Sequence, residues 1–238
     1  EIGLTPNRAD CLSVLGVARD LAVVIDLPFN EEVSASVEPA LDETFPVTVL
    51  SPEKCPRYLG RVIRDVDMNR PTPLFMVERL RRSGIRSIDP VVDITNYVML
   101  ELGQPLHAFN LEALEGGIVV REAQPNEALT LLDGQSREMT AGTLMIADEV
   151  KPLAMAGIMG GDESAVGDDT TDILFESAWF NPLAIAGKER NYGKHTDSSH
   201  RFERGVDSEL QVAAIERATA LMLEICGGEA GPVVIQES

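Results

Sequence analysis

The sequence predicts an α+β fold, in which mixed or antiparallel sheets are flanked by helices. The chain has 238 residues, of which 44% are hydrophobic, and this is enough material for a substantial core. Helical patterns precede and follow a long run of short strand patterns in residues 117–180. Because strands and helices are segregated along the chain more than they alternate, the α+β class is favoured.

The first helix is predicted from Thr5 to about Ile25, with Thr5 as its N-cap and Pro6 at the first helical position. Residues 31–44 are acidic and rich in small side chains, which indicates a linker. The predicted strands at residues 47–50 and 58–66 follow it.

Two further helices have clear start and stop signals. Pro73 begins one that ends at Gly84. In the next, Asp89 is the cap, Pro90 leads and Gly103 ends the helix. The second of these helices has an apolar stripe at helical spacing, formed by Val91, Ile94 or Thr95, Val98 and Leu102.

Short strands and turns are predicted next, in the segments GGIVVREA, ALTLLDG, TLMIADE, PLAMAGIMGG and DILFESAWF. A short helix is expected after Asn181-Pro182. The polar stretch 191–207 is predicted to be a loop, whose Ser, Thr and Asp side chains bond to nearby backbone. The last helix is expected from about Ser208 to Cys226, where Gly227-Gly228 ends it.

Glu176 is unusual because it lies within the strand pattern 172–180, both faces of which are mostly apolar. Two-residue alternation places it on one face with Leu174, Ala178 and Phe180. A carboxylate is almost never buried without a hydrogen-bonding partner. The strand alone leaves two alternatives: a cationic or backbone N–H partner, or a ligand.

The composition limits the classes of function. The formal net charge of −19 argues against a module that binds nucleic acid mainly by neutralising phosphates. No apolar run approaches the ~20 residues of a membrane span. The three cysteines, Cys11, Cys55 and Cys226, are far apart in sequence, which indicates unpaired packing residues in a reducing, cytoplasmic environment. Since the first residue is Glu1, we expect the chain to be a piece of a longer protein.

Few residues are candidates for chemistry. His195 and His200 are five residues apart, which is a poor spacing for zinc, and Arg201 and Arg204 beside Glu203 suggest a local ion-pair cluster. The segment MAGIMGGD lacks the Lys-Ser or Lys-Thr of a phosphate loop, so its glycines either form turns or let backbone N–H groups approach a ligand. His107 is expected in a loop after Gly103, either as a structural histidine or as part of a site.

Several longer motifs together resemble the beta subunit of bacterial phenylalanyl-tRNA synthetase. They are TPNRADCLSVLGVARDLA, DPVVDITNYVMLELGQPLHAFN, AMAGIMGGDES, ESAWFNP and GKHTDSSHRFERGVD. The similarity extends in order over essentially the whole chain. It implies that residues 33–238 have the fold of the family's central editing module, and that residues 1–32 are the end of the preceding small domain.

The resemblance also implies a function, which is the hydrolysis of tyrosine wrongly esterified to the phenylalanine tRNA. Glu176 matches the family's glutamate that binds the tyrosine hydroxyl, and His107 matches its editing-site histidine, assigned here as catalytic. The remaining positions that match the substrate-binding site are Thr95, Asn96, Gly160, Thr196 and Ser198, the last of which departs from the alanine common in the family.

For the complete synthetase, the resemblance implies ATP and Mg²⁺ as cofactors, with none in this chain. It implies two partners: an aminoacylated tRNA, held mainly by other domains, and the alpha subunit in a two-alpha, two-beta heterotetramer. Two alternatives remain open, a non-catalytic structural or tRNA-positioning module of the same subunit and a free-standing editing protein. The helix before residue 32 argues against the second alternative.

Overall fold

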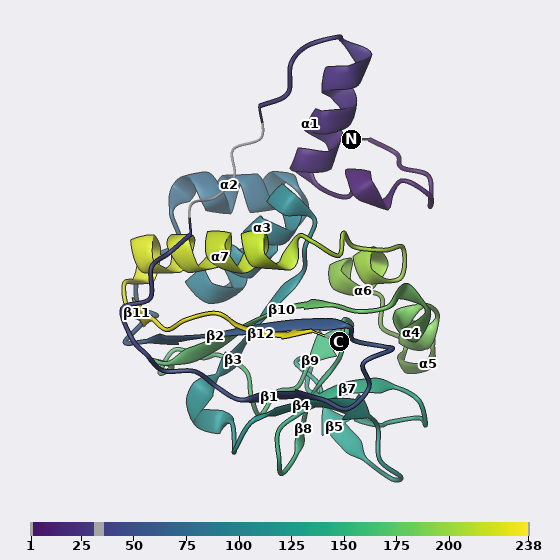
Figure 1. The fold of residues 1–238 in the computed structure, drawn as a ribbon, viewed down its shortest axis with the longest axis vertical. Helices are drawn as coiled ribbons and strands as arrows, with labels where there is room; N and C mark the ends of the chain where they lie inside the picture. Colours follow the sequence, from purple (N-terminus) through teal and green to yellow (C-terminus); the bar gives the residue numbers. More distant parts are fainter. Residues whose placement is uncertain (1, 31–35, 238) are drawn as a thin grey trace.

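The computed structural model describes residues 2–30 and 36–237 and has the predicted α+β class (Figure 1). One mixed sheet has the strand order β1-β4-β7-β8-β9, in which β1 and β4 are parallel and the other pairs antiparallel. We call it the lower sheet, from its place in Figure 1. Its strands are β1 (Val47–Val49), β4 (Ile118–Glu122), β7 (Leu144–Ala147), β8 (Pro152–Met155) and β9 (Met159–Gly160).

The second sheet, which we call the central sheet, is antiparallel and has the order β11-β2-β10-β3, with β12 also pairing with β2. A separate hairpin joins two further strands. The central strands are β2 (Arg57–Arg64), β3 (Leu106–Asn110), β10 (Ile173–Trp179), β11 (Glu229–Ala230) and β12 (Val234–Glu237), and the hairpin strands are β5 (Ala128–Thr130) and β6 (Ser136–Glu138).

Helices cover the face of the central sheet that is turned away from the lower sheet, where α2, α3 and α7 lie (Figure 1). Shorter helices flank the C-terminal end of β10. The helices are α1 (Val14–Val24), α2 (Leu74–Arg82), α3 (Pro90–Leu102), α4 (Pro182–Ile185), α5 (Lys188–Tyr192), α6 (Asp197–Phe202) and α7 (Gln211–Cys226), with 3₁₀ turns at Ala9–Cys11 and Leu111–Ala113.

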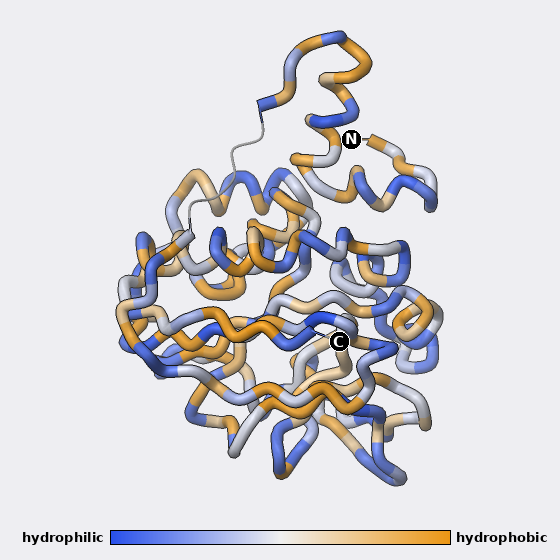
Figure 2. Tube along the Cα trace, in the orientation of Figure 1, coloured by the Kyte–Doolittle hydropathy of each residue, from blue (hydrophilic) through white to orange (hydrophobic). Residues whose placement is uncertain are grey.

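The central sheet is therefore buried on both faces, which explains why β10 is apolar on both. Its lower face packs against the lower sheet and presents Tyr58, Val62, Phe109, Leu174 and Ala178. Its upper face packs against the helices through Leu59, Ile63, Ile173 and Phe175. Hydrophobic residues accordingly follow the paired strands, while the hairpin loops at the bottom of the molecule are hydrophilic (Figure 2).

The third predicted helix is confirmed in detail. The Asp89 carboxylate accepts a hydrogen bond from the Val92 N–H, Pro90 is the first helical residue, and Gly103 ends α3 with a φ of 95°. This left-handed conformation favours glycine because it has no Cβ. The predicted strands and the helix after Pro73 also form, and all three cysteines are free and buried.

The first predicted helix starts too early. Thr5 does not cap it; the chain turns after Thr5 and forms the Ala9–Cys11 turn, and α1 begins only at Val14. Ser13 is the cap and accepts a hydrogen bond from the Gly16 N–H. Gly16 lies so close to the Asp10 carbonyl that a Cβ would be 1.7 Å from its oxygen, so the turn and the helix pack tightly against each other.

Three other predictions need correction. His107 lies in strand β3 and not in a loop. The stretch predicted as a loop contains α6, because Thr196 and Ser199 form a reciprocal capping box, although the expected side-chain bonds to backbone do form. The last helix begins at Gln211, since Asp207 holds the preceding residues in a turn by accepting from the Glu209 N–H.

The predicted linker is only partly described. Residues 36–44 form no helix or strand, whereas the predicted boundary at residues 32 and 33 lies outside the described residues. Within residues 2–30 and 36–237, no helix is long and apolar enough to cross a membrane.

Candidate functional site

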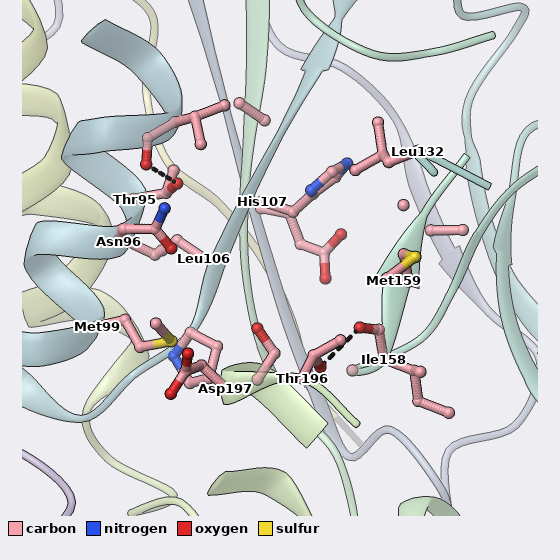
Figure 3. A pocket seen from close by; sticks show the side chains of 18 of the residues that line it. Thr95, Asn96, Met99, Leu106, His107, Leu132, Ile158, Met159, Thr196 and Asp197 are labelled. Carbon is pink, nitrogen blue, oxygen red and sulfur yellow. Dashed lines mark hydrogen bonds between the residues drawn. The ribbon is translucent and has the colours of Figure 1, made fainter. Parts of the chain in front are cut away.

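A cavity of about 570 Å³ lies at the edge strand of the central sheet, and the seven residues predicted from the sequence all line it. They come from separate parts of the fold: α3 (Thr95, Asn96), β3 (His107), β9 (Gly160), β10 (Glu176) and the start of α6 (Thr196, Ser198). Figure 3 shows the labelled α3 residues on one side, Met159 on the other, and Thr196 and Asp197 below.

Glu176 and His107 are direct partners across the antiparallel strands β10 and β3. Directly opposite residues share a face, so both side chains are on the face that looks toward the lower sheet. Glu176 is 5% exposed, and its Oε2 has no hydrogen-bond partner among the described residues; the same holds for His107 Nε2. The arginine or backbone N–H partner that the strand pattern allowed for this oxygen is therefore not present.

Burial shifts the pKa values of these two side chains in opposite directions. Desolvation raises the pKa of Glu176 to about 8, and the neighbouring Tyr58 hydroxyl opposes this shift. Desolvation lowers the pKa of His107 to about 4. At neutral pH His107 is therefore uncharged and Glu176 is largely protonated, so the cavity floor combines two nearly neutral polar groups.

Gly160 brings the backbone of β9 into contact with the His107 ring. A Cβ at position 160 would lie 2.6 Å from His107 Cε1 and 3.2 Å from a methyl group of Leu132. The absent side chain is thus part of the shape of the cavity. Among the alternatives for MAGIMGGD, the close approach of backbone to a site fits this position best.

The α3 wall is held in place by a buried carboxylate outside the cavity. Asp93 is fully buried and accepts hydrogen bonds from the Thr72 and Ser87 hydroxyls and from the Ile88 N–H. These bonds fix the start of α3 against the preceding loop. One turn later the Thr95 hydroxyl donates to the Val92 carbonyl at 2.9 Å, which leaves its methyl group for the cavity. The half-buried Asn96 lies beside it on the same wall.

The α6 wall depends on Thr196. Its hydroxyl accepts from the Ser199 N–H at 3.0 Å and donates to the Ile158 carbonyl at 2.9 Å. The same side chain therefore caps α6 and ties it to the residues before β9 (Figure 3). Ser198 follows in the first turn of α6 and lines the cavity.

The apolar lining of the cavity and its charged rim were not predicted from the sequence. Met99, Leu106, Leu132, Ile158 and Met159 surround the cavity, and Arg86, His195 and Asp197 also line it. Two signals were available, because Met99 is one helical turn after Thr95, and Ile158 and Met159 adjoin Gly160. Leu132 had none, since only the tertiary fold brings its loop to the site.

The arrangement suits an amphipathic ligand. Apolar side chains line much of the cavity, and behind it the Phe109 ring packs against His107 with ring centroids 4.5 Å apart. A carboxyl oxygen and an imidazole nitrogen remain there to bond a polar group on the ligand. No group of three or more His, Cys, Asp or Glu side chains that could hold a metal ion occurs in residues 2–30 and 36–237.

The two-sheet fold with this edge cavity defines a domain of a known class, and the chain belongs to the B3/4 domain family, whose model matches residues 54–227. Its similar proteins indicate a particular member of this family. It is 59% identical over 234 residues to the phenylalanine–tRNA ligase beta subunit of Yersinia pestis, and 61% identical over 235 residues to that of Pseudomonas putida. Both alignments include 98% of this chain, which spans 29% and 30% of the relatives' lengths.

Among solved structures, an N-terminal fragment of the phenylalanyl-tRNA synthetase beta subunit from Pyrococcus horikoshii is similar, with 14% identity and a TM-score of 0.47. The match includes 98% of this chain and 65% of that one.

Proposed function

We propose that this chain is a post-transfer editing domain, which hydrolyses tyrosine wrongly esterified to the phenylalanine tRNA. The observation that carries the proposal is the buried Glu176 carboxyl, which lines an otherwise mainly apolar cavity and has no cationic partner among the described residues. The names of the relatives, as beta subunits of phenylalanine–tRNA ligase, provide the substrate context.

Discrimination follows from the cost of leaving Glu176 unpaired. A pocket for an apolar ring rejects an added hydroxyl weakly, whereas a site built to bond that hydroxyl can reject the analogue lacking it by roughly 10⁴–10⁵. A tyrosine ring in the cavity would bond the Glu176 carboxyl through its phenol. A phenylalanine ring would leave the carboxyl dry and unpaired, and it would bind much more weakly.

His107 is placed to help position the substrate. Its register partner is Glu176. A tyrosine whose phenol is bound to Glu176 would therefore have its aromatic ring close to the His107 imidazole. A histidine with a pKa of about 4 is a weak general base at neutral pH. We therefore assign it to holding the ring and the ester or its water in place, while backbone N–H groups near Gly160 stabilise the developing oxyanion.

The wider setting is proposed on the same grounds. We place the domain in a cytoplasmic two-alpha, two-beta ligase, in which other domains hold most of the tRNA, and ATP and Mg²⁺ serve the aminoacylation step. The net charge of −19 is consistent with the RNA being held elsewhere.

The test uses the complete ligase that contains this chain, with Glu176→Ala and His107→Ala variants. In Glu176→Ala the phenol of a bound tyrosine is left without a partner, which costs ~1–3 kcal/mol and should slow hydrolysis of Tyr-tRNA by about one to two orders of magnitude. Correct Phe-tRNA should become a better substrate of that variant than of the wild type. His107→Ala should lose hydrolysis without gaining cleavage of Phe-tRNA, and aminoacylation should be unchanged in both.

Two results would contradict the proposal. One is normal Tyr-tRNA hydrolysis by a folded Glu176→Ala variant. The other is a wild-type enzyme without Tyr-tRNA hydrolysis, and this would favour the non-catalytic module instead.

A further inference from the structure

Tyr58 is a fully buried tyrosine on β2, and it lies next to Glu176 without lining the cavity. Its register partner on β10 is Ala178, and the partner of Glu176 is Gly60, so Tyr58 and Glu176 share the lower face of the central sheet. Tyr58 is therefore the diagonal neighbour of Glu176 across this strand pair, a separation that an aromatic side chain can span. Because Tyr58 does not line the cavity, it approaches the Glu176 carboxyl from the side that faces away from the cavity.

The Tyr58 hydroxyl is an unusual group at this place. It has no hydrogen-bond partner of good geometry among the described residues, and neither has Glu176 Oε2. Other residues on this face of the central sheet, such as Val62, Leu174 and Phe109, are apolar. A phenylalanine would fill the same space without burying an unpaired hydroxyl, which costs free energy. The adjacent unpaired atoms of Tyr58 and Glu176 can satisfy each other after a small movement.

We propose that Tyr58 is a positioning residue for Glu176: its hydroxyl donates to Oε2 and holds the other carboxyl oxygen toward the cavity, ready for a phenol. This inference rests on the proposed function for its effect on editing, but the contact between Tyr58 and Glu176 stands apart from it. Tyr58 thereby sets the selectivity for tyrosine over phenylalanine without touching the substrate.

The other titratable groups around Glu176 do not provide this hydrogen bond. Cys55, before β2, directs its thiol to the Arg57 carbonyl, and burial raises the pKa of this thiol, so it stays neutral. His107 flanks Glu176 on β3 and has an unpaired Nε2. The charged or titratable groups of the cavity rim are Arg86, His195 and Asp197. Of all these groups, only the Tyr58 hydroxyl lowers the pKa of Glu176, against the larger effect of burial.

The first test measures the pKa of Glu176 directly, by NMR of carboxyl carbons in the 238-residue chain, with Glu176→Gln to assign the signal. Removing the donor in Tyr58→Phe should raise this pKa above its wild-type value. A fluorinated tyrosine at position 58 retains the shape and donates more strongly, so it should lower the pKa. If a folded Tyr58→Phe variant and the fluorinated protein both left the pKa unchanged, the inference would be wrong.

Tyr192→Phe is the matched control. Tyr192 is also a buried tyrosine of the same core, but its hydroxyl bonds Thr140 and Thr143, and none of these three residues lines the cavity. Its loss should reduce stability and leave the pKa of Glu176 unchanged. An equal shift in Tyr58→Phe and Tyr192→Phe would show a general loosening of the core and would overturn the specific role of Tyr58.

The second test measures hydrolysis of Tyr-tRNA and Phe-tRNA by the complete ligase. Tyr58→Phe should reduce the ratio of the two rates by about tenfold, which corresponds to one hydrogen bond of ~1.4 kcal/mol. Tyr192→Phe should leave this ratio unchanged. An unchanged ratio in Tyr58→Phe, with active wild type, would refute the role in selectivity. If the wild type lacked hydrolysis, the proposed function would fail, and the pKa measurement would still decide whether Tyr58 positions Glu176.

Discussion

Glu176 and His107 lie opposite each other on neighbouring antiparallel strands, and burial removes charge from both. Two ionisable groups that are neutral under the same conditions need no counter-ion, so the floor of the cavity can remain dry. Each group ionises readily only when the chain unfolds. The stability of the folded state should therefore fall in acid, where His107 ionises, and in alkali, where Glu176 ionises.

The first prediction concerns stability at alkaline pH. The pKa of Glu176 is raised from 4.5 to about 8 in the folded chain, so its contribution to stability is complete below pH 4.5 and is lost as the pH rises through 8. Glu176→Gln should therefore gain stability relative to wild type over this range, on the order of 5 kcal/mol at ~1.4 kcal/mol per pKa unit. Urea denaturation at several pH values measures the difference.

Glu112→Gln is the control for this series, because Glu112 is an exposed carboxylate. Its stability relative to wild type should vary little over the same range. A Glu176→Gln difference that is constant with pH would show that Glu176 titrates in the folded chain as it does in the unfolded chain.

The second prediction concerns acid. The pKa of His107 is lowered from 6.5 to about 4, so the stability that it contributes is present above pH 6.5 and is lost as the pH falls through 4. His107→Gln should lose less stability than wild type between these values, by on the order of 3 kcal/mol. The measurement is the same denaturation series, with His195→Gln, at an exposed rim histidine, as the comparison. Parallel curves for wild type and His107→Gln would contradict the prediction.

The third prediction tests the absent side chain at position 160. Gly160→Ala should force the His107 ring to move, since the new Cβ would lie 2.6 Å from Cε1. We expect a loss of roughly 1–3 kcal/mol of stability, typical of overpacking, and a weakened affinity of the chain for free tyrosine. Calorimetric titration and thermal unfolding measure the two effects.

Gly167→Ala is the matched substitution, because a Cβ there meets nothing within 4 Å. It should leave tyrosine binding unchanged. Equal tyrosine affinities of Gly160→Ala and wild type would show that the ring and the backbone of β9 adjust without affecting the cavity.

The fourth prediction concerns the cap of α6. Thr196→Ala removes both the bond from the Ser199 N–H and the bond to the Ile158 carbonyl, so it should cost about 1–2 kcal/mol of stability. It should also free α6 from the residues before β9, which hydrogen exchange at the Ser199 amide would detect. Thr196→Ser retains the hydroxyl and should show little of either effect. If both variants behaved alike, the methyl group and not the hydroxyl would hold this wall.

The local parts of this fold were predictable because their signals are adjacent in sequence. For α3 the cap at Asp89, the leading Pro90 and the final Gly103 act within a few residues of the ends that they define. The first helix shows the opposite case. Thr5-Pro6 has the sequence of a helix start, but the packing of Gly16 against Asp10 places the start at Ser13 instead. Tertiary contact overrides a correct local preference.

The resemblance predicted which residues line the cavity. It did not predict how these residues pair or how burial shifts their pKa values. Strand alternation correctly assigned Glu176 to a face, but not the identity of the residue opposite. That His107 stands there depends on the register between β10 and β3, which are separated by more than sixty positions in the sequence. Likewise, nothing near Tyr58 in the sequence shows that it shares a face of the sheet with Glu176.

The buried Arg201 side chain limits where the chain can be cut. It extends from α6 and donates through Nε to the Leu12 carbonyl at 3.1 Å, while its Nη1 donates to the Asp197 carbonyl and carboxylate. An expression fragment that begins after residue 32 would keep the guanidinium and lose this acceptor. The guanidinium would then need water in place of this carbonyl, beside the first turn of α6, whose residues Asp197 and Ser198 line the cavity. For crystallisation or ligand screening, residues 2–30 should therefore be retained, because Leu12 supports the helix that forms one wall of the cavity.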